Sequence, residues 1–291
     1  MKVLVTGGSG SLGQAVCKYA QTIDSVLLNA PSHSEFDIND YDQCSKYLKN
    51  NNFDALIHAA AITDLEYCEK HPELAKRVNT EGTKNMVRLS QKHNLFLTYI
   101  STHAVFGQNN CEGITEKGTP QKPTNTYALT KLAGEESMVA LNPKKYAIVR
   151  LGWMLSEDLI KDKKMIGAIF RKLADNVEEL KIVSDTTGSL TYAPHAANMI
   201  LNITIDKSYG IFHAVNPDPI SRYELVKQLF TRADVAVKLV PVSSDHFPST
   251  VKSPMHSVLK NTNLRYILPD IPDAIDEVIE HNKDFLRRIR T

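Results

Sequence analysis

The sequence predicts an α/β protein whose parallel sheet is covered by helices on both faces. Apolar, β-branched runs alternate with segments of helical spacing, and the connections between them are short. Such alternation is typical of a parallel sheet. Three glycines, Gly7, Gly10 and Gly13, directly follow the first apolar run. Because crossover connections are right-handed, a doubly wound Rossmann sheet is the leading arrangement.

The expected strands are short runs that end close to glycine or polar residues. The first, KVLVT, ends at the glycines and is apolar enough to be buried on both faces. The four later runs alternate less regularly but are likewise rich in apolar residues. The five strands are expected at 2–6, 25–30, 54–61, 95–102 and 145–152.

The expected helices lie between these runs. Residues 11–21 place Leu12, Ala15, Val16 and Tyr19 at helical spacing. A second helix at 40–51 gathers apolar residues on one face, and a long helix at 73–93 begins just after a proline. A fourth helix follows a Pro-rich loop and contains NTYALTKLAGEE at 125–136.

The alternation weakens after about residue 152. Prolines and polar loops become frequent at 217–219, 241–254 and 269–272. We therefore expect a dinucleotide-binding Rossmann domain at 1–152. Residues 153–291 are expected to form a smaller α+β substrate-binding region, interleaved with the sheet.

Composition excludes several classes of protein. The chain has 291 residues, 42% of them hydrophobic, and a formal charge of +1, which argues against a nucleic-acid binder. Its 4 cysteines stand far apart without CxxC spacing, so we expect neither a metal site nor a disulfide framework. No apolar run approaches the roughly 18 residues of a membrane span, and the start lacks a signal-peptide pattern. We expect a cytoplasmic protein with no membrane partner.

The glycine loop TGGSGSLG is the strongest local signal for a ligand. Gly7 permits a tight turn, Gly10 lets a pyrophosphate approach the backbone, and Gly13 lets helix and strand pack closely. The helix that begins with Ser11 and Leu12 offers backbone N–H groups and a positive dipole end to phosphates. At the start of a βαβ chain, this pattern predicts dinucleotide binding.

The choice between NADP and NAD is left open, with a preference for NADP. The second strand ends at Asn29 rather than at an acid that would bind a ribose 2′-hydroxyl and repel a 2′-phosphate. Ser32, His33 and Ser34 could donate hydrogen bonds to such a phosphate, although no arginine lies nearby. The alternative for these three residues is an ordinary solvated loop.

Tyr127 and Lys131 are 4 residues apart and share a helix face. Thr102 ends the fourth strand, at the carboxyl edge where open α/β sheets bind ligands. An ammonium about 4 Å from the phenol would favour the phenolate by roughly 4 kcal/mol at an effective dielectric near 20. We therefore expect the pKa of Tyr127 to be lowered from about 10 towards neutrality, which suits proton exchange with a carbinol oxygen.

The chain resembles the extended short-chain dehydrogenase/reductases, most closely their dTDP-4-dehydrorhamnose reductase-like branch. The matching stretches follow the family's order along nearly the whole chain. They are TGGSGSLG at 6–13, FDIND at 36–40, HAAAITDLEYCEKHPELAKRVN at 58–79, YISTHAVFG at 99–107, ITEKGTPQKPTNTYALTKLAGEE at 114–136 and IVRLGWM at 148–154, with weaker matches in SDTTGSLTYA at 184–193 and SPMHSVL at 253–259.

The resemblance assigns a role to each matching position. Thr102, Tyr127 and Lys131 match the family's catalytic residues, and Asn79 matches a structural asparagine. Cofactor contacts are implied for Gly7, Gly10, Ser11, Leu12, Gly13, Asp37, Ile38, Ala59, Ala60, Ala61, Tyr127 and Lys131. Substrate contacts are implied for Thr63, Leu65, Thr102, His103, Trp153 and Lys252.

Two departures concern the sugar side of the site. After Thr102 the chain has His103 and Ala104 where the family usually has aspartate and tyrosine. The late Arg-Pro-x-Asn-Ser signature is replaced by residues 253–257, SPMHS, for which Lys252 could supply the missing cation. Arg222 is a second candidate for a diphosphate. For His103 we favour a polar wall of the pocket without a proton role.

The leading functional hypothesis is an NAD(P)H-dependent reductase of the 4-keto group of a nucleotide-linked deoxysugar. The first alternative is a sugar-nucleotide epimerase that keeps NAD bound. The second is a non-catalytic NAD(P)-binding subunit that regulates a partner enzyme. The absence of two acids after Thr102 argues against a dehydratase. The identity of the sugar and a homodimeric state are left open.

Overall fold

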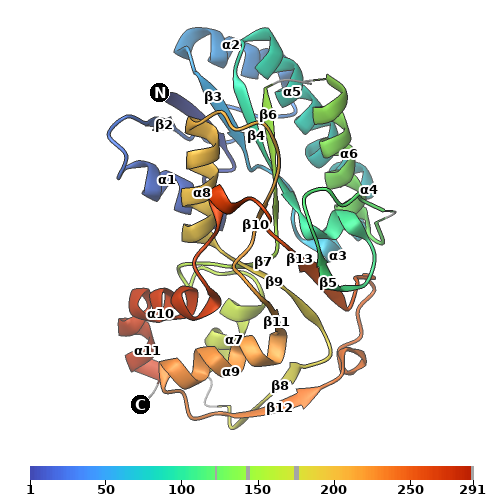
Figure 1. The fold of residues 1–291 in the computed structure, drawn as a ribbon, viewed down its shortest axis with the longest axis vertical. Coiled ribbons are helices and arrows are strands. Elements are labelled where there is room, and N and C mark those ends of the chain that lie inside the picture. The colour runs from blue at the N-terminus through green and yellow to red at the C-terminus, as the bar shows by residue number, and fades with distance from the viewer. Residues whose placement is uncertain (122, 142–144, 174–176, 290–291) are drawn as a thin grey trace.

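A six-stranded parallel sheet forms the upper half of the molecule in the computed structural model, which describes residues 1–121, 123–141, 145–173 and 177–289 (Figure 1). The strand order is β10-β6-β4-β3-β1-β2. The strands are β1 (Lys2–Thr6), β2 (Leu27–Asn29), β3 (Ala55–His58), β4 (Phe96–Thr102), β6 (Tyr146–Leu151) and β10 (Gly210–Ala214). All five expected strands lie in this sheet, which is the doubly wound arrangement that the sequence predicted.

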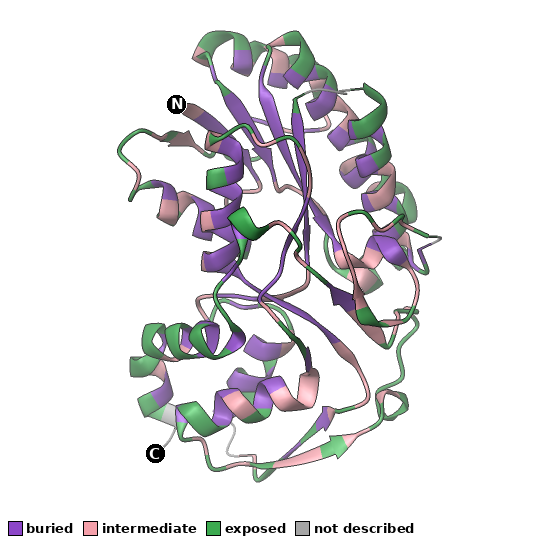
Figure 2. Ribbon diagram, viewed as in Figure 1, coloured by how far each residue is buried: buried purple, intermediate pink, exposed green. Residues whose placement is uncertain are grey.

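Alternate residues of the strands face opposite layers of helices. Val3 and Val5 of β1 pack with α1 (Ser11–Ala20) and α8 (Ala193–Ile205), whereas Leu4 packs in a separate core with α2 (Tyr41–Asn51), α5 (Thr83–Lys92) and α6 (Thr126–Leu141). Because successive side chains of a strand point to opposite faces, a continuous apolar run buries both faces of the sheet. Figure 2 shows the resulting pattern, with buried strands between helices whose outer faces are exposed.

The long helix expected at 73–93 is not a uniform α-helix. It starts as α4 (Pro72–Lys76), continues as a π-helical segment from Arg77 to Gly82, and resumes as α5. A short helix that the sequence analysis did not expect, α3 (Leu65–Lys70), precedes it and is capped by Asp64. π-helical segments often mark functional positions because they shift a side chain out of the α-helical register.

The lower half of the molecule contains smaller sheets and further helices (Figure 1). One sheet has the order β11-β9-β13-β5, with β7 paired to β9, and a second pairs β12 with β8. The strands are β5 (Asn110–Ile114), β7 (Trp153–Leu155), β8 (Glu179–Val183), β9 (Thr187–Tyr192), β11 (Pro219–Ser221), β12 (Lys238–Val242) and β13 (His256–Leu259). The helices are α7 (Met165–Leu173), α9 (Arg222–Ala233), α10 (Ile271–His281) and α11 (Lys283–Ile289).

The two halves exchange segments of chain. β10 follows residue 152 but completes the upper sheet, and α8 packs against that sheet, while β5 precedes residue 152 and pairs with β13 below. The division of roles at residue 152 therefore stays a proposal. In the described parts of the chain, no helix combines the length and the apolar character needed to cross a bilayer.

Candidate active site

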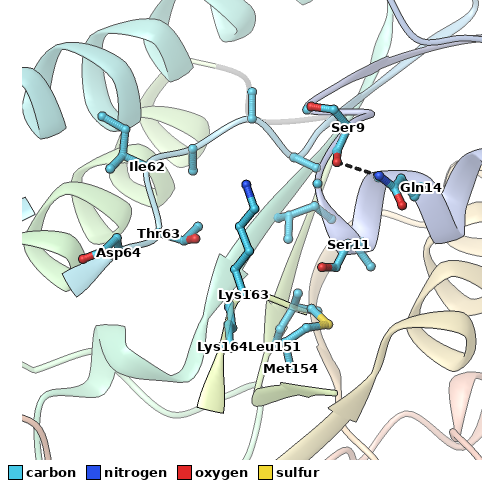
Figure 3. Close-up of a pocket in the computed structure, with 18 of the residues that line it drawn as sticks. Ser9, Ser11, Gln14, Ile62, Thr63, Asp64, Leu151, Met154, Lys163 and Lys164 are labelled. Atoms are coloured by element: carbon cyan, nitrogen blue, oxygen red, sulfur yellow. Dashed lines mark hydrogen bonds between the residues drawn. The ribbon is translucent and has the colours of Figure 1, made fainter. Parts of the chain in front are cut away.

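A cleft of about 1750 Å³ opens at the carboxyl ends of β1, β3, β4 and β6. Pockets for a single small ligand usually measure about 300–1,000 Å³, so this cleft has room for a larger ligand or two. Its lining includes the glycine loop, residues 59–66, Thr102, Tyr127 and Lys131. Figure 3 shows the β3 turn, with Ile62 and Thr63, facing the turn that carries Ser9 and Ser11.

Glycine is required at two positions of the loop for different reasons. Gly7 has φ +74°, and a Cβ on it would lie 2.7 Å from the backbone N of Ala60. A Cβ on Gly13 would lie 2.1 Å from the carbonyl oxygen of Gly7, so only glycine allows the helix to approach the strand so closely. At Gly10 the nearest atom would be 3.4 Å away, which leaves that face of the loop open to the cleft.

His58, at the end of β3, is a buried link between the glycine turn and α5. Its Nδ1 lies 2.8 Å from Thr6 Oγ1, and its Nε2 lies 3.0 Å from Thr83 Oγ1. Because Thr83 donates its own hydroxyl proton to the Asn79 carbonyl, Nε2 must carry the imidazole proton. Burial lowers the pKa of His58 to about 3, with a smaller contribution from Lys131. His58 is therefore neutral, as expected for a structural residue.

Asn79, in the π-helical segment, fixes the loop that follows β3. Its side-chain oxygen accepts from the N–H of Ile62 at 2.8 Å, and its amide donates to the Ile62 carbonyl at 2.9 Å. The same amide donates to Thr130 Oγ1 at 3.1 Å, and Thr130 donates to the carbonyl of Tyr127 at 2.8 Å. One buried side chain thus sets the spacing between two walls of the cleft.

Tyr127 and Thr102 lie together, but the expected acidic phenol is not found. Tyr127 is half-buried at the cleft wall, and the protein packed around its hydroxyl raises its pKa to about 12, against the lowering effect of a hydrogen bond with Thr102. Our expectation of a pKa near neutrality was wrong. Desolvation of the phenolate outweighs the attraction that we had assigned to Lys131.

Lys131 explains part of the difference between the expected and the observed pKa of Tyr127. Burial lowers its pKa to about 7, partly offset by Glu135, so near neutral pH the amine is only partly charged. Its Nζ lies 4.0 Å from the centre of the Tyr99 ring, and the Tyr99 hydroxyl donates to the Lys131 carbonyl at 3.3 Å. A partly neutral amine does little to stabilise a phenolate.

A buried ion pair lies beneath these residues. Arg150 of β6 donates to Glu135 of α6 through Nε at 2.9 Å and Nη2 at 2.7 Å. Ser101 donates to the same carboxylate at 2.5 Å, and the guanidinium lies 4.8 Å from the Phe106 ring centre. This bidentate pair joins the helix that carries Tyr127 and Lys131 to β6, and Ser101 links the same carboxylate to the end of β4.

Most of the residues expected to contact the substrate line the cleft. Thr63, Leu65, His103 and Trp153 all line it, and the Arg222 guanidinium lies 5.2 Å from the Trp153 ring centre. Burial lowers the pKa of His103 to about 4, and its Nδ1 lies 3.3 Å from the Leu151 carbonyl oxygen.

Lys252 occupies a different place. Its backbone carbonyl accepts from Thr124 and Asn125, both at 3.0 Å, and its exposed side chain is absent from the described lining of the cleft. Its role as a substrate contact stays a prediction.

The cleft lining contains an acidic residue that the sequence analysis missed. Ile38 and Ala59 to Ala61 line the cleft, whereas Asp37 lies outside the described lining and accepts hydrogen bonds from Asn39 at 3.0 and 2.9 Å. Glu35 lines it and accepts from the N–H and hydroxyl of Ser32 at 2.9 and 2.7 Å. We had looked for an acid only at the strand end; the loop sequence SHSE contained the signal.

The charge run KDKK at 161–164 lines the cleft together with Arg171 of α7, and its three lysines are exposed. Figure 3 shows Lys163 and Lys164 in this part of the lining. The run follows the strand that ends at Leu151, and ligands of open α/β sheets bind at the carboxyl ends of the strands. Among the described residues, no cluster of His, Cys, Asp and Glu could hold a metal ion.

Comparisons with known proteins agree over nearly the whole chain. The model of the RmlD substrate binding domain matches residues 1–283. A Mycolicibacterium smegmatis dTDP-4-dehydrorhamnose reductase is 29% identical over 97% of this chain and 88% of that protein. The crystal structure of a Clostridium acetobutylicum dTDP-4-dehydrorhamnose reductase has a TM-score of 0.90 and 30% identity, covering 97% of this chain and 100% of the other. The Bacillus anthracis enzyme, solved in complex with NADP, has a TM-score of 0.89 and 28% identity, covering 96% and 98%.

Proposed function

The chain belongs to the RmlD substrate binding domain family, and on that premise we propose that it is an NADPH-dependent reductase of the 4-keto group of a dTDP-linked deoxysugar. The observation that carries the proposal is the meeting of Thr102, Tyr127 and Lys131 with the glycine loop in one cleft. The cytoplasm is the compartment we propose for it, and a homodimer is an assembly to test.

The residues of the cleft fit a dinucleotide. The open face of Gly10 and the first N–H groups of α1, from Ser11 and Leu12, offer a phosphate site that a Cβ would obstruct. Ile38 and the run Ala59 to Ala61 provide an apolar wall for the adenine side. When bound, NADPH supplies hydride to the carbonyl carbon.

Tyr127 is the residue that we assign as proton donor. A pKa of about 12 keeps the phenol protonated at neutral pH, which is the form that reduction needs because the carbonyl oxygen becomes a hydroxyl. Thr102, hydrogen-bonded to Tyr127, is placed to hold the same oxygen. Lys131, when protonated, places a positive charge beside the oxygen on which negative charge develops.

The substrate side is assigned by position. Thr63, Leu65, His103 and Trp153 form the wall next to the catalytic residues, and the neutral imidazole of His103 can exchange hydrogen bonds with sugar hydroxyls. Arg222, stacked near Trp153, is our candidate for the substrate diphosphate. Lys252 would need to turn towards the cleft to contribute.

The test is turnover of dTDP-4-dehydrorhamnose with NADPH by the purified protein. We expect one NADPH oxidised per sugar reduced. Tyr127→Phe is expected to lower kcat by about 10²- to 10⁴-fold, because it removes the proton donor, while NADPH binding stays nearly unchanged. Activity without added NADPH would indicate the epimerase alternative. If Tyr127→Phe lost only a complex with a partner enzyme, the non-catalytic alternative would replace our proposal.

A further inference from the structure

The segment that precedes α7 is held in a fixed shape by its own side chains. Asp158 Oδ1 accepts hydrogen bonds from the N–H groups of Ile160 and Lys161, both at 3.0 Å. The buried Asp162 accepts from the N–H of Lys164 at 2.8 Å. Two carboxylates therefore fold this polar stretch into successive turns, as Asp does when it bonds to nearby backbone N–H groups.

The same segment is tied to the helices beside it. Arg171 of α7 donates through Nη1 to the carbonyls of Ile160 and Asp162, at 3.2 and 2.5 Å. Asn282, between α10 and α11, accepts from the N–H of the fully buried Leu159 at 3.0 Å. A loop anchored at several points can present a side chain to a ligand with little loss of conformational entropy on binding.

Lys163 is the residue that this loop presents to the cleft. Figure 3 shows its side chain extending into the space between the turn with Ile62 and Thr63 and the turn with Ser9 and Ser11. The residue lies only 10 positions after Trp153, which was expected to contact the substrate. Its amine is nevertheless directed to the part of the cleft formed by the glycine loop.

The acidic residues that line the cleft already have other partners. Asp64 accepts from the N–H of Tyr67 at 2.8 Å, and Glu66 lies 3.7 Å from Lys70. Glu35 accepts both hydrogen bonds from Ser32, and Asp162 accepts from the N–H groups of Lys164 and Gly167 at 2.8 and 3.3 Å. Within the part of the chain that the structure describes, no ion pair involves Lys163.

We propose that Lys163 binds the pyrophosphate of the dinucleotide, closing over it from the side away from the glycine loop. The backbone N–H groups of the loop are neutral donors, so a phosphate bound there keeps its negative charge on the face turned to solvent. An ammonium held at that face completes the site, because Lys binds phosphate as a point charge. This inference rests on the proposed cofactor and adds one residue to its binding.

The test compares the dissociation constants of NADPH, NADH and dTDP for the wild-type protein, Lys163→Met, Lys163→Arg and Lys172→Met. Lys163→Met keeps the apolar stem and removes the charge, while Lys163→Arg keeps the charge. Lys172 is an exposed lysine of α7 outside the described lining of the cleft and serves as the matched control. Unfolding temperatures of all four proteins check that the fold is kept.

We expect Lys163→Met to weaken the binding of NADPH and of NADH by the same factor, about tenfold to a hundredfold, as for loss of a charge-assisted hydrogen bond. Lys163→Arg should restore most of the affinity, Lys172→Met should have no effect, and dTDP should bind equally to all four. The loss should also shrink at high salt, because the phosphate charge is screened.

Three results would overturn the inference while leaving the reductase proposal intact. Unchanged affinity for both dinucleotides would show that Lys163 has no role in binding them. Weaker binding of NADPH with unchanged binding of NADH would show that Lys163 contacts the 2′-phosphate. Weaker binding of dTDP alone would show that Lys163 contacts the substrate. A wild-type protein that bound neither dinucleotide would end the proposed function and this inference together.

Discussion

Lys131 is an amine that the fold withdraws from water in the lining of the cleft. Its pKa, lowered to about 7 by burial, means that folding works against protonation of this amine. Residues with perturbed pKa values in clefts are typical of active sites. The surroundings that shift the pKa also lower the stability of the fold. Tyr127 shows the same effect in the opposite direction, since burial disfavours its charged form.

Lys131→Met is expected to stabilise the protein in a pH-dependent way. Above about pH 10.5 the amine is neutral in both states, so the wild type carries no penalty. As the pH falls from about 10.5 to about 7, the unfolded chain binds the proton first, and stability is lost, by up to on the order of 5 kcal/mol at about 1.4 kcal/mol for each unit. The advantage of Lys131→Met should grow over that range and then level off.

The measurement is the free energy of unfolding from urea titrations between pH 6 and pH 10 (roughly the window of the pKa change). Leu132→Met, on the same helix, changes no titrating group, so its difference from the wild type should be equal at every pH. An advantage of Lys131→Met that did not change with pH would show that packing, and not the charge, is responsible.

At the scale of elements, the π-helical segment decides how the cleft is built. Asn79 lies in it, fully buried, and joins the loop at Ile62 to α6 at Thr130. The sequence analysis expected a uniform helix at this point, because apolar spacing does not reveal a single wider turn. The resemblance nevertheless had marked Asn79 as structural, and its hydrogen bonds fit that role.

Asn79→Ala is expected to destabilise the protein by about 1–3 kcal/mol, since it leaves the N–H and carbonyl of Ile62 without their partner. The kcat should fall as well, because the loop and α6 lose their common support. Denaturant unfolding and turnover check the two effects. Asn202→Ala, at an exposed position of α8, is the control and should change neither. Loss of stability with full activity would limit Asn79 to a role in folding.

At the scale of the whole molecule, the cleft lies where the upper sheet meets the lower half. Its lining runs from the glycine loop through the end of β6 to Arg222 at the start of α9. A ligand that spans it contacts both halves, and only in the folded state. Binding should therefore stabilise the protein as a unit.

NADPH at about 100 times its dissociation constant is expected to stabilise the protein by about 2.7 kcal/mol, and so to raise Tm by several degrees. Gly10→Ala should fold normally, because its Cβ would meet the Gly7 carbonyl oxygen at 3.4 Å, an ordinary contact. Its Tm should nevertheless respond much less to NADPH, since the methyl group occupies the face open to the phosphates. Thermal unfolding with and without NADPH measures this; an equal response in both proteins would place the pyrophosphate elsewhere.

The sequence alone determined the sheet, the glycine turn and the positions of Thr102, Tyr127 and Lys131, because these follow from local periodicity, turn chemistry and the family resemblance. Only the tertiary structure decided how those residues are charged, since the pKa values of Tyr127 and Lys131 depend on burial by distant segments. It also decided that Glu35 and Lys163 reach the cleft. Their sequence positions identify them as loop residues, and which loops meet is set by the packing of the two halves.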